Sequence, residues 1–274
     1  MTQQQQTING FLVDVFNDVL RLEERSLRKE RTGLSLTELH VLETVQRVSE
    51  ERGGTMADVA AALGSPFCTM CASFPFGYDH PDFPPLRYVV ELQKWSYANA
   101  DMDRDWDRNW REYVAAVKEL CRYAAAKNIR VLVEPHPYRW VNSAQSMRRL
   151  IDHVQEENLG FNFDPSHLFA CGDMPEWAVY AMRGRLWHTH FSDNDTITNA
   201  HWRPGLGKMN WKAILRALKD IGYDGALNFE LEDVPGAATP GSASAAMSNE
   251  MEEELAEAKS YITNICQRLD IALE

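Results

Sequence analysis

The sequence lacks the features of a membrane or exported protein. No stretch approaches the roughly 18 consecutive apolar residues that a membrane helix needs. The N-terminal sequence MTQQQQ has neither the basic start nor the apolar run of a signal peptide. We therefore expect a cytoplasmic protein that has no membrane partner.

Positive charge is scarce relative to negative charge. The 28 lysines and arginines are outnumbered by 40 aspartates and glutamates, which gives a net charge of −12 at pH 7. This balance disfavours sequence-independent attraction to nucleic acid or anionic membranes, although it is compatible with a local basic patch. Nucleic acid is therefore not an expected partner.

Cysteine is also scarce, with 5 residues in a chain of 274. An odd number of scattered cysteines and the lack of an export signal argue against a disulfide framework. Cys68 and Cys71 have the C-x-x-C spacing, but no second Cys or His pair lies near them in the sequence. We interpret them as an inert pair in an apolar segment rather than as a metal or redox site.

The first domain, residues 1–65, is predicted to be a helical segment. Apolar residues recur at helical spacing over 7–31. The capping-box sequence SLTE opens a second helix over 35–48, and the sequence TMAD opens a third over 55–63, which Gly64 closes. These three helices precede a segment of different, more aromatic and proline-rich composition.

This helical segment resembles the start of a MarR-type winged-helix regulator. The matching parts are TINGFLVDVFNDVLRLEE, SLTELHVLETV and TMADVAAALG. In that family a recognition helix follows, whereas here residues 65–71 have the sequence SPFCTMC. We therefore favour a helical cap on the second domain, or a fusion remnant, over a DNA-binding domain.

Four short apolar segments in the second half each end on a side chain that can bind a metal. They are VLVE, GFNFD, LWHTH and ALNFE, which end at Glu134, Asp164, His190 and Glu230. Helices are predicted between them, over 143–157, 174–182 and 210–221. In a parallel β/α barrel the carboxyl end of every strand points to one mouth, so these four side chains would converge. The pattern predicts a divalent-metal site, and therefore an enzyme.

The predicted fold class is α/β, with a TIM-barrel-like second domain over residues 66–274. A closed barrel has eight strands, whereas the sequence offers the four named above and one or two more around 67–73. We therefore expect an incomplete barrel without its N-terminal strands. Its open edge would need covering by the helical segment or by a second copy of the chain, as in a homo-oligomer. The remaining predicted elements are helices over 85–99, 105–127 and 249–272 and a flexible loop over 234–248.

Two of the residues at the strand ends, Glu134 and Asp164, could have purely structural roles instead of binding a metal. Glu134 could form a salt bridge to an arginine, since a carboxylate at the end of a buried strand needs a cation of some kind. Asp164 could cap the helix that follows it. His167, three residues further on, offers a second ligand or a proton carrier. We favour the functional interpretation of all three residues.

The other two strand ends each leave a choice between neighbouring residues. For His188 and His190 we expect the imidazoles to face opposite sides of the strand, with His190 in the mouth and His188 in the packing. Glu230 and Glu232 share one face of their strand, so spacing alone does not decide between them.

Several nearby residues are candidates for substrate contacts. Asp193 follows the third strand end at a position suited to substrate or to supporting a ligand. His201 and Arg203 lie in the glycine-bearing sequence HWRPGLG, where an arginine suits the hydroxyl or phosphate oxygens of a substrate. His136 lies just past the first strand end and could line the pocket.

With these residues the chain resembles the sugar phosphate isomerase/epimerase group of the xylose-isomerase-like TIM barrels, which is related to endonuclease IV. The resemblance is good over about residues 128–233 and looser over 66–127. It rests on VLVEPHP, GFNFDPSHL, HTHFSDND and HWRPGLGKMNWKAILRALKDIGYDGALNFELE.

The resemblance implies a set of roles for these residues. His167 and Arg203 fall where family members contact substrate, and Glu134 and Glu230 match the acid/base pair. The implied ligands of one divalent ion are Glu134, Asp164, His190 and Glu230. Oxygen and nitrogen donors without thiolate suit Mn²⁺, Mg²⁺ or Co²⁺, with Zn²⁺ also compatible.

The implied reaction is proton transfer beside the carbonyl of a small sugar or sugar phosphate, through an ene-diolate. A dehydratase of keto-polyols would use the same site. An abasic-site endonuclease is disfavoured, because it would need three metals, extra histidines on early strands and a less acidic surface. The remaining alternative is a MarR-like DNA-binding regulator in which the barrel senses a sugar.

Overall fold

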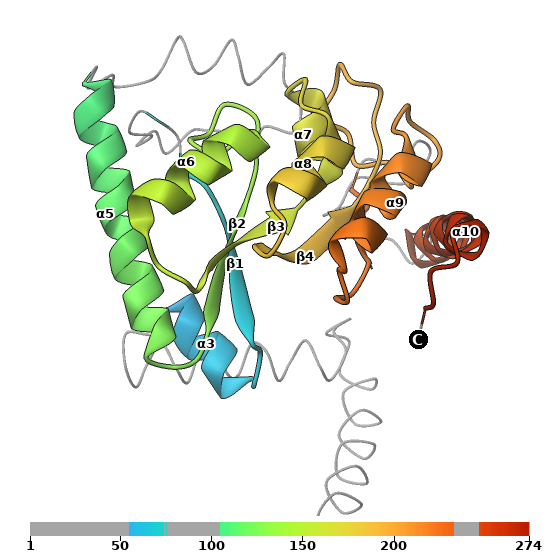
Figure 1. Cartoon of the computed structure of the whole chain (residues 1–274). Coiled ribbons are helices and arrows are strands. Elements are labelled where there is room, and N and C mark those ends of the chain that lie inside the picture. The colour runs from blue at the N-terminus through green and yellow to red at the C-terminus, as the bar shows by residue number, and fades with distance from the viewer. Residues whose placement is uncertain (1–54, 74, 76–104, 233–246, 274) are drawn as a thin grey trace, which may run out of the picture. The chain divides into compact units, whose positions relative to one another are not determined.

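The chain divides into two compact units, Met1–Pro66 and Phe67–Glu274. The computed structural model (Figure 1) describes residues 55–73, 75, 105–232 and 247–273. No helix within these ranges is long and apolar enough to cross a membrane.

In the second unit, strands and helices alternate along most of the described chain. The strands are β1 (Phe67–Cys71), β2 (Arg130–Glu134), β3 (Leu159–Phe163), β4 (Leu186–Phe191) and β5 (Asn228–Phe229). The helices are α3 (Met56–Ala62), α5 (Trp106–Ala125), α6 (Ala144–Val154), α7 (Pro165–Ala170), α8 (Pro175–Ala181), α9 (Trp211–Ile221) and α10 (Met247–Arg268). The predicted strands are confirmed, as are the predicted helices that fall on described residues. The predicted helices over 7–31, 35–48 and 85–99, and most of the predicted loop over 234–248, lie outside the described residues.

The first unit is described through α3, which begins with a reciprocal capping box. The Thr55 hydroxyl accepts a hydrogen bond from the Asp58 amide at 3.3 Å, and the Asp58 carboxylate accepts one from the Thr55 amide at 2.9 Å. These two bonds satisfy amides that the first turn of a helix leaves without intrahelical partners. Gly64, with φ of 71°, follows the end of the helix. The helix predicted from TMAD is therefore confirmed.

The second unit is built on a parallel sheet in which the strands follow chain order from β1 to β5. Each pair of neighbours is parallel, and the register pairs Cys71 with Glu134 and His190 with Asn228. In Figure 1 the strands run side by side as the half of a barrel, with the helices as connections. This confirms the incomplete TIM-barrel-like fold: the described residues supply five parallel strands, where a closed barrel has eight.

The helices cover the sheet because their apolar faces match the outward faces of the strands. α5 packs against β2, α6 against β3 and α7 against β4, while α8 packs on α9 and α10 on α9. Large side chains with almost no exposed surface fill the space between these layers. They include Leu132, Met147, Leu150, Phe161, Phe163, Phe191, Trp211, Ile214 and Leu215.

An irregularity between β3 and β4 shapes the inner face of the half-barrel. The register shifts between Phe161 and Asn162, so Trp187 has no register partner on β3. The Arg130 guanidinium lies 4.6 Å from the centroid of the Trp187 ring. A Cβ atom at Gly160 would collide with this ring and would lie 2.8 Å from the Arg185 carbonyl oxygen. Glycine at position 160 is therefore what allows the ring to lie against the strand.

We expect Gly160→Ala to lower the free energy of unfolding by about 1–3 kcal/mol, because the added methyl group must displace a packed ring and a backbone carbonyl. Urea denaturation of the full chain would measure the change. The exposed Lys212→Ala on α9 is the control and should change stability by less than about 0.5 kcal/mol. Equal stability of Gly160→Ala and the parent chain would contradict the packing described for Trp187.

Candidate metal centre

The four predicted ligands lie together at the carboxyl ends of four consecutive strands. Glu134 ends β2, Asp164 follows β3, His190 lies near the end of β4 and Glu230 follows β5. One ligand atom from each of them lies within 4.8 Å of the others. The parallel register brings them together, because it carries every carboxyl end to the same edge of the sheet. We call these residues the four-residue cluster.

His190 stands between two glutamates of the cluster. Its Nδ1 atom lies 2.6 Å from Oε1 of Glu134 and 2.7 Å from Oε2 of Glu230. A single proton on Nδ1 can serve one of these carboxylates at a time, so the cluster gathers more negative charge than its imidazole can balance. An additional positive charge would therefore be stabilised here.

The pKa values of these groups follow from this crowding. Burial alone would raise the pKa of Glu134, but its polar contacts with His136 and His190 and the charges of His190 and His167 bring it well below its usual range. Burial alone would lower the pKa of His190, but its hydrogen bonds to Glu134 and Glu230 and their negative charges raise it to about 10. In the metal-free protein at neutral pH, His190 is therefore an imidazolium beside ionised Glu134.

Asn162 is a buried member of this site that the sequence analysis missed. Its Nδ2 atom donates to Oε1 of Glu134 at 2.9 Å and lies 3.2 Å from Nδ1 of His190. The side chain has no exposed surface. The available signal was the alternation of β3, which places Asn162 two residues before Asp164 and therefore on the same side of the sheet.

Asp164 caps the following helix with one carboxylate oxygen and directs the other into the cluster. Its Oδ1 atom caps α7 by accepting hydrogen bonds from the amides of Ser166 at 2.7 Å and His167 at 3.3 Å. Its Oδ2 atom lies 3.6 Å from Nε2 of both His167 and His201. This oxygen is buried and has no hydrogen-bond partner among the residues that the structure describes. Capping thus uses one oxygen and leaves the other for the site.

His167 and His201 are oriented by one neighbour. Nδ1 of His167 lies 2.8 Å from Oδ1 of Asn199, and Nδ1 of His201 lies 3.0 Å from the Asn199 backbone oxygen. Because both Nδ1 atoms face carbonyl-type acceptors, both Nε2 atoms are directed toward Asp164. Burial lowers the pKa of His167 to about 3. Burial alone would lower the pKa of His201, but the negative charge of the neighbouring Asp164 raises it to about 9.

His136 lies beside the cluster, where the sequence predicted a pocket-lining residue. Its ring stacks near that of His167, with centroids 3.6 Å apart, and its Nε2 atom lies 3.8 Å from Oε2 of Glu134. Burial would lower its pKa, but hydrogen bonds with Cys71 and Glu134 raise it to about 9. The substrate-binding roles of His136, His167 and His201 stay predictions, although the structure places all three next to the cluster.

Asp193 lies inside the loop after β4 rather than in the cluster. Its carboxylate accepts hydrogen bonds from the amides of Gly205 at 2.9 Å and Met209 at 3.2 Å, and from Nε1 of Trp211 at 2.8 Å. A Cβ atom at Gly207 would collide with the same carboxylate. Asp193 therefore organises the loop that carries His201, and any direct contact with substrate stays a prediction.

Arg203 is held by the last helix in this structure. Its Nε atom lies 2.9 Å from Glu254 Oε2, and its Nη2 atom lies 2.5 Å from Glu257 Oε2. Both glutamates belong to α10. The predicted contact of Arg203 with substrate oxygens would have to compete with these two ion pairs, and it stays a prediction.

The expectation that His188 and His190 face opposite sides was wrong. Their ring centroids lie 5.2 Å apart, because residues two positions apart on a strand share a face. His188 packs against Phe67, with ring centroids 4.7 Å apart, and its Nε2 atom lies 2.8 Å from Asn228 Nδ2. His188 therefore lines the inner face of the sheet below His190.

The choice between Glu230 and Glu232 is clearer in the structure than in the sequence. Glu230 lies in the cluster, whereas Glu232 is exposed and its amide donates to the His201 carbonyl oxygen at 3.1 Å. The amide of Glu230 continues the parallel pairing of β5 with β4 by donating to the Phe191 carbonyl oxygen at 3.2 Å. Glu230 is therefore the glutamate with access to the other three donors.

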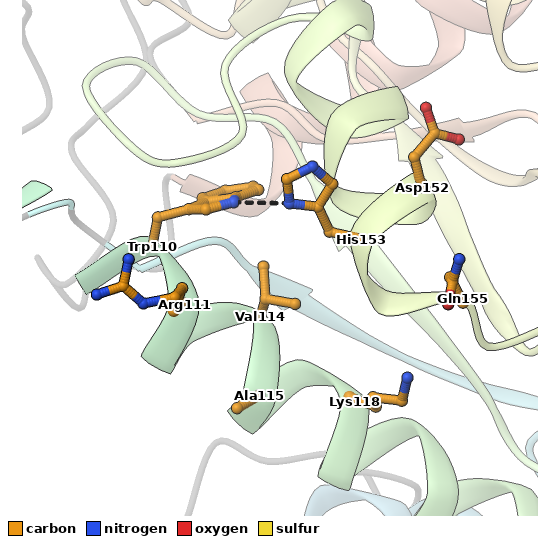
Figure 2. Close-up of a pocket in the computed structure, with 8 residues that line it drawn as sticks. All are labelled: Trp110, Arg111, Val114, Ala115, Lys118, Asp152, His153 and Gln155. Atoms are coloured by element: carbon orange, nitrogen blue, oxygen red, sulfur yellow. Dashed lines mark hydrogen bonds between the residues drawn. The ribbon is translucent and has the colours of Figure 1, made fainter. Parts of the chain in front are cut away.

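A separate hollow of about 490 Å³ lies between α5 and α6 (Figure 2). The indole Nε1 of Trp110 donates to Nδ1 of His153 across it at 2.9 Å. The other lining residues are Arg111, Val114, Ala115, Lys118, Asp152 and Gln155. None of the predicted site residues lines this hollow, so it is distinct from the cluster.

Comparison with known proteins identifies the family. The family model described as "Xylose isomerase-like TIM barrel" matches residues 42–260, and the chain therefore belongs to this family. The match begins inside the segment that resembles a MarR-type regulator, and nothing in the structure shows a winged-helix domain in the part of the chain that it describes.

Individual relatives are distant and longer than the region matched. An inosose dehydratase of Lacticaseibacillus casei is 24% identical over 151 residues, which are 49% of this chain and 51% of that protein. A fructoselysine 3-epimerase of Escherichia coli O157:H7 is 28% identical over 126 residues, 44% of this chain and 46% of that protein. The chain spans about half the length of the curated relatives it matches.

Solved structures support the same fold. The crystal structure of a 3-keto-D-glucoside 4-epimerase from E. coli matches with a TM-score of 0.54 and 18% identity over 74% of this chain and 67% of that one. At this identity the likeness shows the fold alone. Together, the family match and the solved structures show a xylose-isomerase-like TIM-barrel fold.

We expect divalent-ion binding to become tighter as the pH rises from 7 to 9. In the metal-free protein the pKa of His190 is raised from 6.5 to about 10, so its proton must leave before the imidazole can bind a cation. Each pH unit in this window should strengthen binding by about tenfold per proton released. Calorimetric titration with Mn²⁺ in buffers of different ionisation enthalpy would measure both quantities.

His153→Gln, a change in the separate hollow, is the control and should leave the pH dependence intact. An affinity for Mn²⁺ that is the same at pH 7 and pH 9, with no proton released, would contradict the placement of His190 among the ligands.

Proposed function

We propose that this chain is a metal-dependent isomerase or epimerase of a small sugar or sugar phosphate. The observation that carries the proposal is the convergence of three carboxylates and one imidazole within 4.8 Å. The fit to a cation is supported by the buried oxygen Asp164 Oδ2, which lacks a hydrogen-bond partner within the described part of the chain.

The donor set indicates the kind of ion. Three carboxylates and one imidazole are hard or intermediate ligands, which suit Mn²⁺, Mg²⁺ or Co²⁺ and are compatible with Zn²⁺. When bound, such an ion would polarise the carbonyl of a substrate and stabilise the negative charge that develops as a neighbouring proton leaves. The ligands we propose are Glu134, Asp164, His190 and Glu230.

We assign the proton transfers to Glu134 and Glu230. One carboxylate would remove the proton beside the carbonyl to give an ene-diolate, and the other would return a proton at the same or the adjacent carbon. Asn162 would hold the Glu134 carboxylate in place through its 2.9 Å hydrogen bond. The low pKa of Glu134 keeps it ionised and therefore able to accept a proton at neutral pH.

The substrate would be recognised by the imidazoles around the cluster. His136, His167 and His201 offer ring nitrogens to sugar hydroxyl groups, and the neutral state of His167 lets it donate or accept. Arg203 would add a contact to hydroxyl or phosphate oxygens if it leaves its partners on α10. Asp193 would act indirectly, by fixing the loop that carries His201.

Two broader parts of the proposal concern the rest of the chain. We treat residues 1–65 as a helical segment and 66–274 as the barrel domain, and we propose a cytoplasmic enzyme with a small-molecule partner. The regulator hypothesis depends on the first 54 residues, which lie outside the described residues. We do not favour it, because the family match already begins at residue 42.

A dehydratase of keto-polyols is the second candidate. The observation in its favour is that curated relatives are named inosose dehydratase and 3-dehydroshikimate dehydratase. Its chemistry begins with the same proton abstraction beside a carbonyl, after which a hydroxyl group leaves as water. The four-residue cluster is suited to this first step in either reaction.

We expect Glu134→Gln and Glu230→Gln each to reduce turnover by about 100- to 10,000-fold while the fold is retained, because each change removes a proton acceptor without removing volume. A panel of ketoses and keto-polyols, assayed with Mn²⁺ and with chelator, would supply the activity to be compared. Near-ultraviolet circular dichroism would check the fold.

The matched control for these variants is Glu232→Gln, since Glu232 shares the strand end but is exposed. It should keep turnover within about twofold, as exposed positions usually tolerate such changes. Full activity of Glu134→Gln, or equal losses in all three variants, would reject the acid/base assignment.

We also expect the reaction in D₂O to place deuterium beside the carbonyl of the recovered sugar, because the abstracted proton exchanges on a solvent-accessible carboxylate. Mass spectrometry of substrate and product would distinguish the candidates. An epimerase gives a product of the same formula plus one deuterium, whereas a dehydratase gives a product that has lost water. Turnover to an isomer without any deuterium at that carbon would refute the epimerase mechanism.

A further inference from the structure

A second group of potential ligands lies next to the four-residue cluster, on the neighbouring strand. The parallel register pairs Cys71, the last residue of β1, with Glu134, the last residue of β2. Paired residues on adjacent strands project to the same side of a sheet. Accordingly, Sγ of Cys71 lies 3.8 Å from Oε2 of Glu134.

His136 completes this second group. It lies two residues beyond Glu134, and its Nε2 atom is 3.8 Å from the same Oε2 atom. One ligand atom from each of Cys71, Glu134 and His136 lies within 4.8 Å of the other two. The imidazole of His136 contacts the His167 ring at a centroid distance of 3.6 Å. The backbone of His136 is held by its amide, which donates to the Val141 carbonyl oxygen at 2.9 Å.

The two oxygens of Glu134 face different groups. Oε1 receives the hydrogen bond of Asn162 and faces His190, whereas Oε2 faces Cys71 and His136. The side chain is 7% exposed, so both oxygens are directed into the protein. A carboxylate in this arrangement can bridge two cations, with one oxygen for each.

The spacing of the second group fits a tetrahedral ion. With bonds of about 2.3 Å to sulfur and about 2.0–2.1 Å to nitrogen or oxygen, neighbouring ligand atoms around Zn²⁺ lie about 3.4–3.6 Å apart. The two separations of 3.8 Å to Glu134 Oε2 are close to this value. Small side-chain rotations would therefore suffice to bring all three atoms to bonding distance.

The C-x-x-C sequence is not itself the chelating unit. Cys68 and Cys71 lie three residues apart on β1, so their side chains point to opposite faces of the sheet. Cys68 is 8% exposed and belongs to the core, whereas Cys71 is exposed at the strand end. The partners of Cys71 come from the end of β2 and the loop that follows it. Glu134 lies 63 residues from Cys71 in the sequence.

We propose that Cys71, Glu134 and His136 form a second divalent-metal site of the zinc class, with Glu134 shared between this ion and the one in the four-residue cluster. A thiolate and an imidazole favour Zn²⁺ or Co²⁺, whereas the cluster, which has no thiolate, suits harder ions as well. Three protein ligands leave one position of a tetrahedral ion open to water or substrate. This site has its own ligand set, but it shares Glu134 with the proposed function, and an ion bound to Oε2 would withdraw Glu134 from proton transfer.

Cobalt substitution of the full chain tests the site, because a thiolate bound to Co²⁺ gives a charge-transfer band in the near ultraviolet. We expect the parent chain to show this band and to bind two Co²⁺ ions per chain by elemental analysis. Cys71→Ser should lose the band and one ion while retaining the other. Cys68→Ser, the matched control on the same strand, should keep the band and both ions.

Glu230→Gln separates this proposal from the proposed function. This change should weaken the binding of the ion in the four-residue cluster and leave the thiolate band unchanged. A failure of one site is therefore distinguishable from a failure of the other. A parent chain without the band, a Cys71→Ser variant that keeps it, or a Cys68→Ser variant that loses it would overturn the second site. Competition by Zn²⁺ should abolish the band in the parent chain at equimolar addition.

Discussion

Burial of negative charge at the carboxyl end of the sheet is the constraint on which the surrounding structure depends. The Asp164 side chain has no exposed surface and that of Glu134 has 7%, and an unpaired buried carboxylate costs several kcal/mol. Each carboxylate is therefore supplied with a donor: Asn162 for Glu134 and the first turn of α7 for Asp164. His190 lies between Glu134 and Glu230 and provides a positive charge in the metal-free protein. These neighbours make the site stable enough to form and still leave oxygens that a cation could use.

The sequence was sufficient to predict the strands and the residues at their ends, because both are local signals. A short apolar run followed by a polar residue indicates a buried parallel strand and the position of its carboxyl end. The parallel arrangement then brings the carboxyl ends of neighbouring strands together. The same reasoning could not choose between Glu230 and Glu232, since the choice depends on contacts made after β5, where the Glu232 amide bonds to the His201 carbonyl oxygen. It also placed His188 on the wrong side, although the alternation of a strand already required His188 and His190 to share a face.

Contacts between strands lay beyond prediction, because register is a property of the folded sheet. Cys71 was interpreted as inert for lack of a partner nearby in sequence, yet the end of β2 and the loop after it supply Glu134 and His136 beside it. The irregularity between β3 and β4 likewise has no sequence marker except Gly160, whose missing side chain leaves room for the Trp187 ring. Asn162, by contrast, could have been predicted, because the alternation of β3 places it on the same side of the sheet as Asp164.

The donors come from consecutive strands, and this explains how an incomplete barrel can still assemble a family-type site. Glu134, Asp164, His190 and Glu230 are carried by β2, β3, β4 and β5, and each of these strands is fixed by its neighbour in the sheet. Closure of the barrel would protect the sheet edges and shape the substrate pocket, but it is not needed to bring these four side chains together. The loop after β4 follows the same logic, since Asp193 holds it from within and α10 holds it through Arg203. Positioning of the site therefore depends on local registers and buried hydrogen bonds, whereas the choice of substrate depends on the walls that surround it.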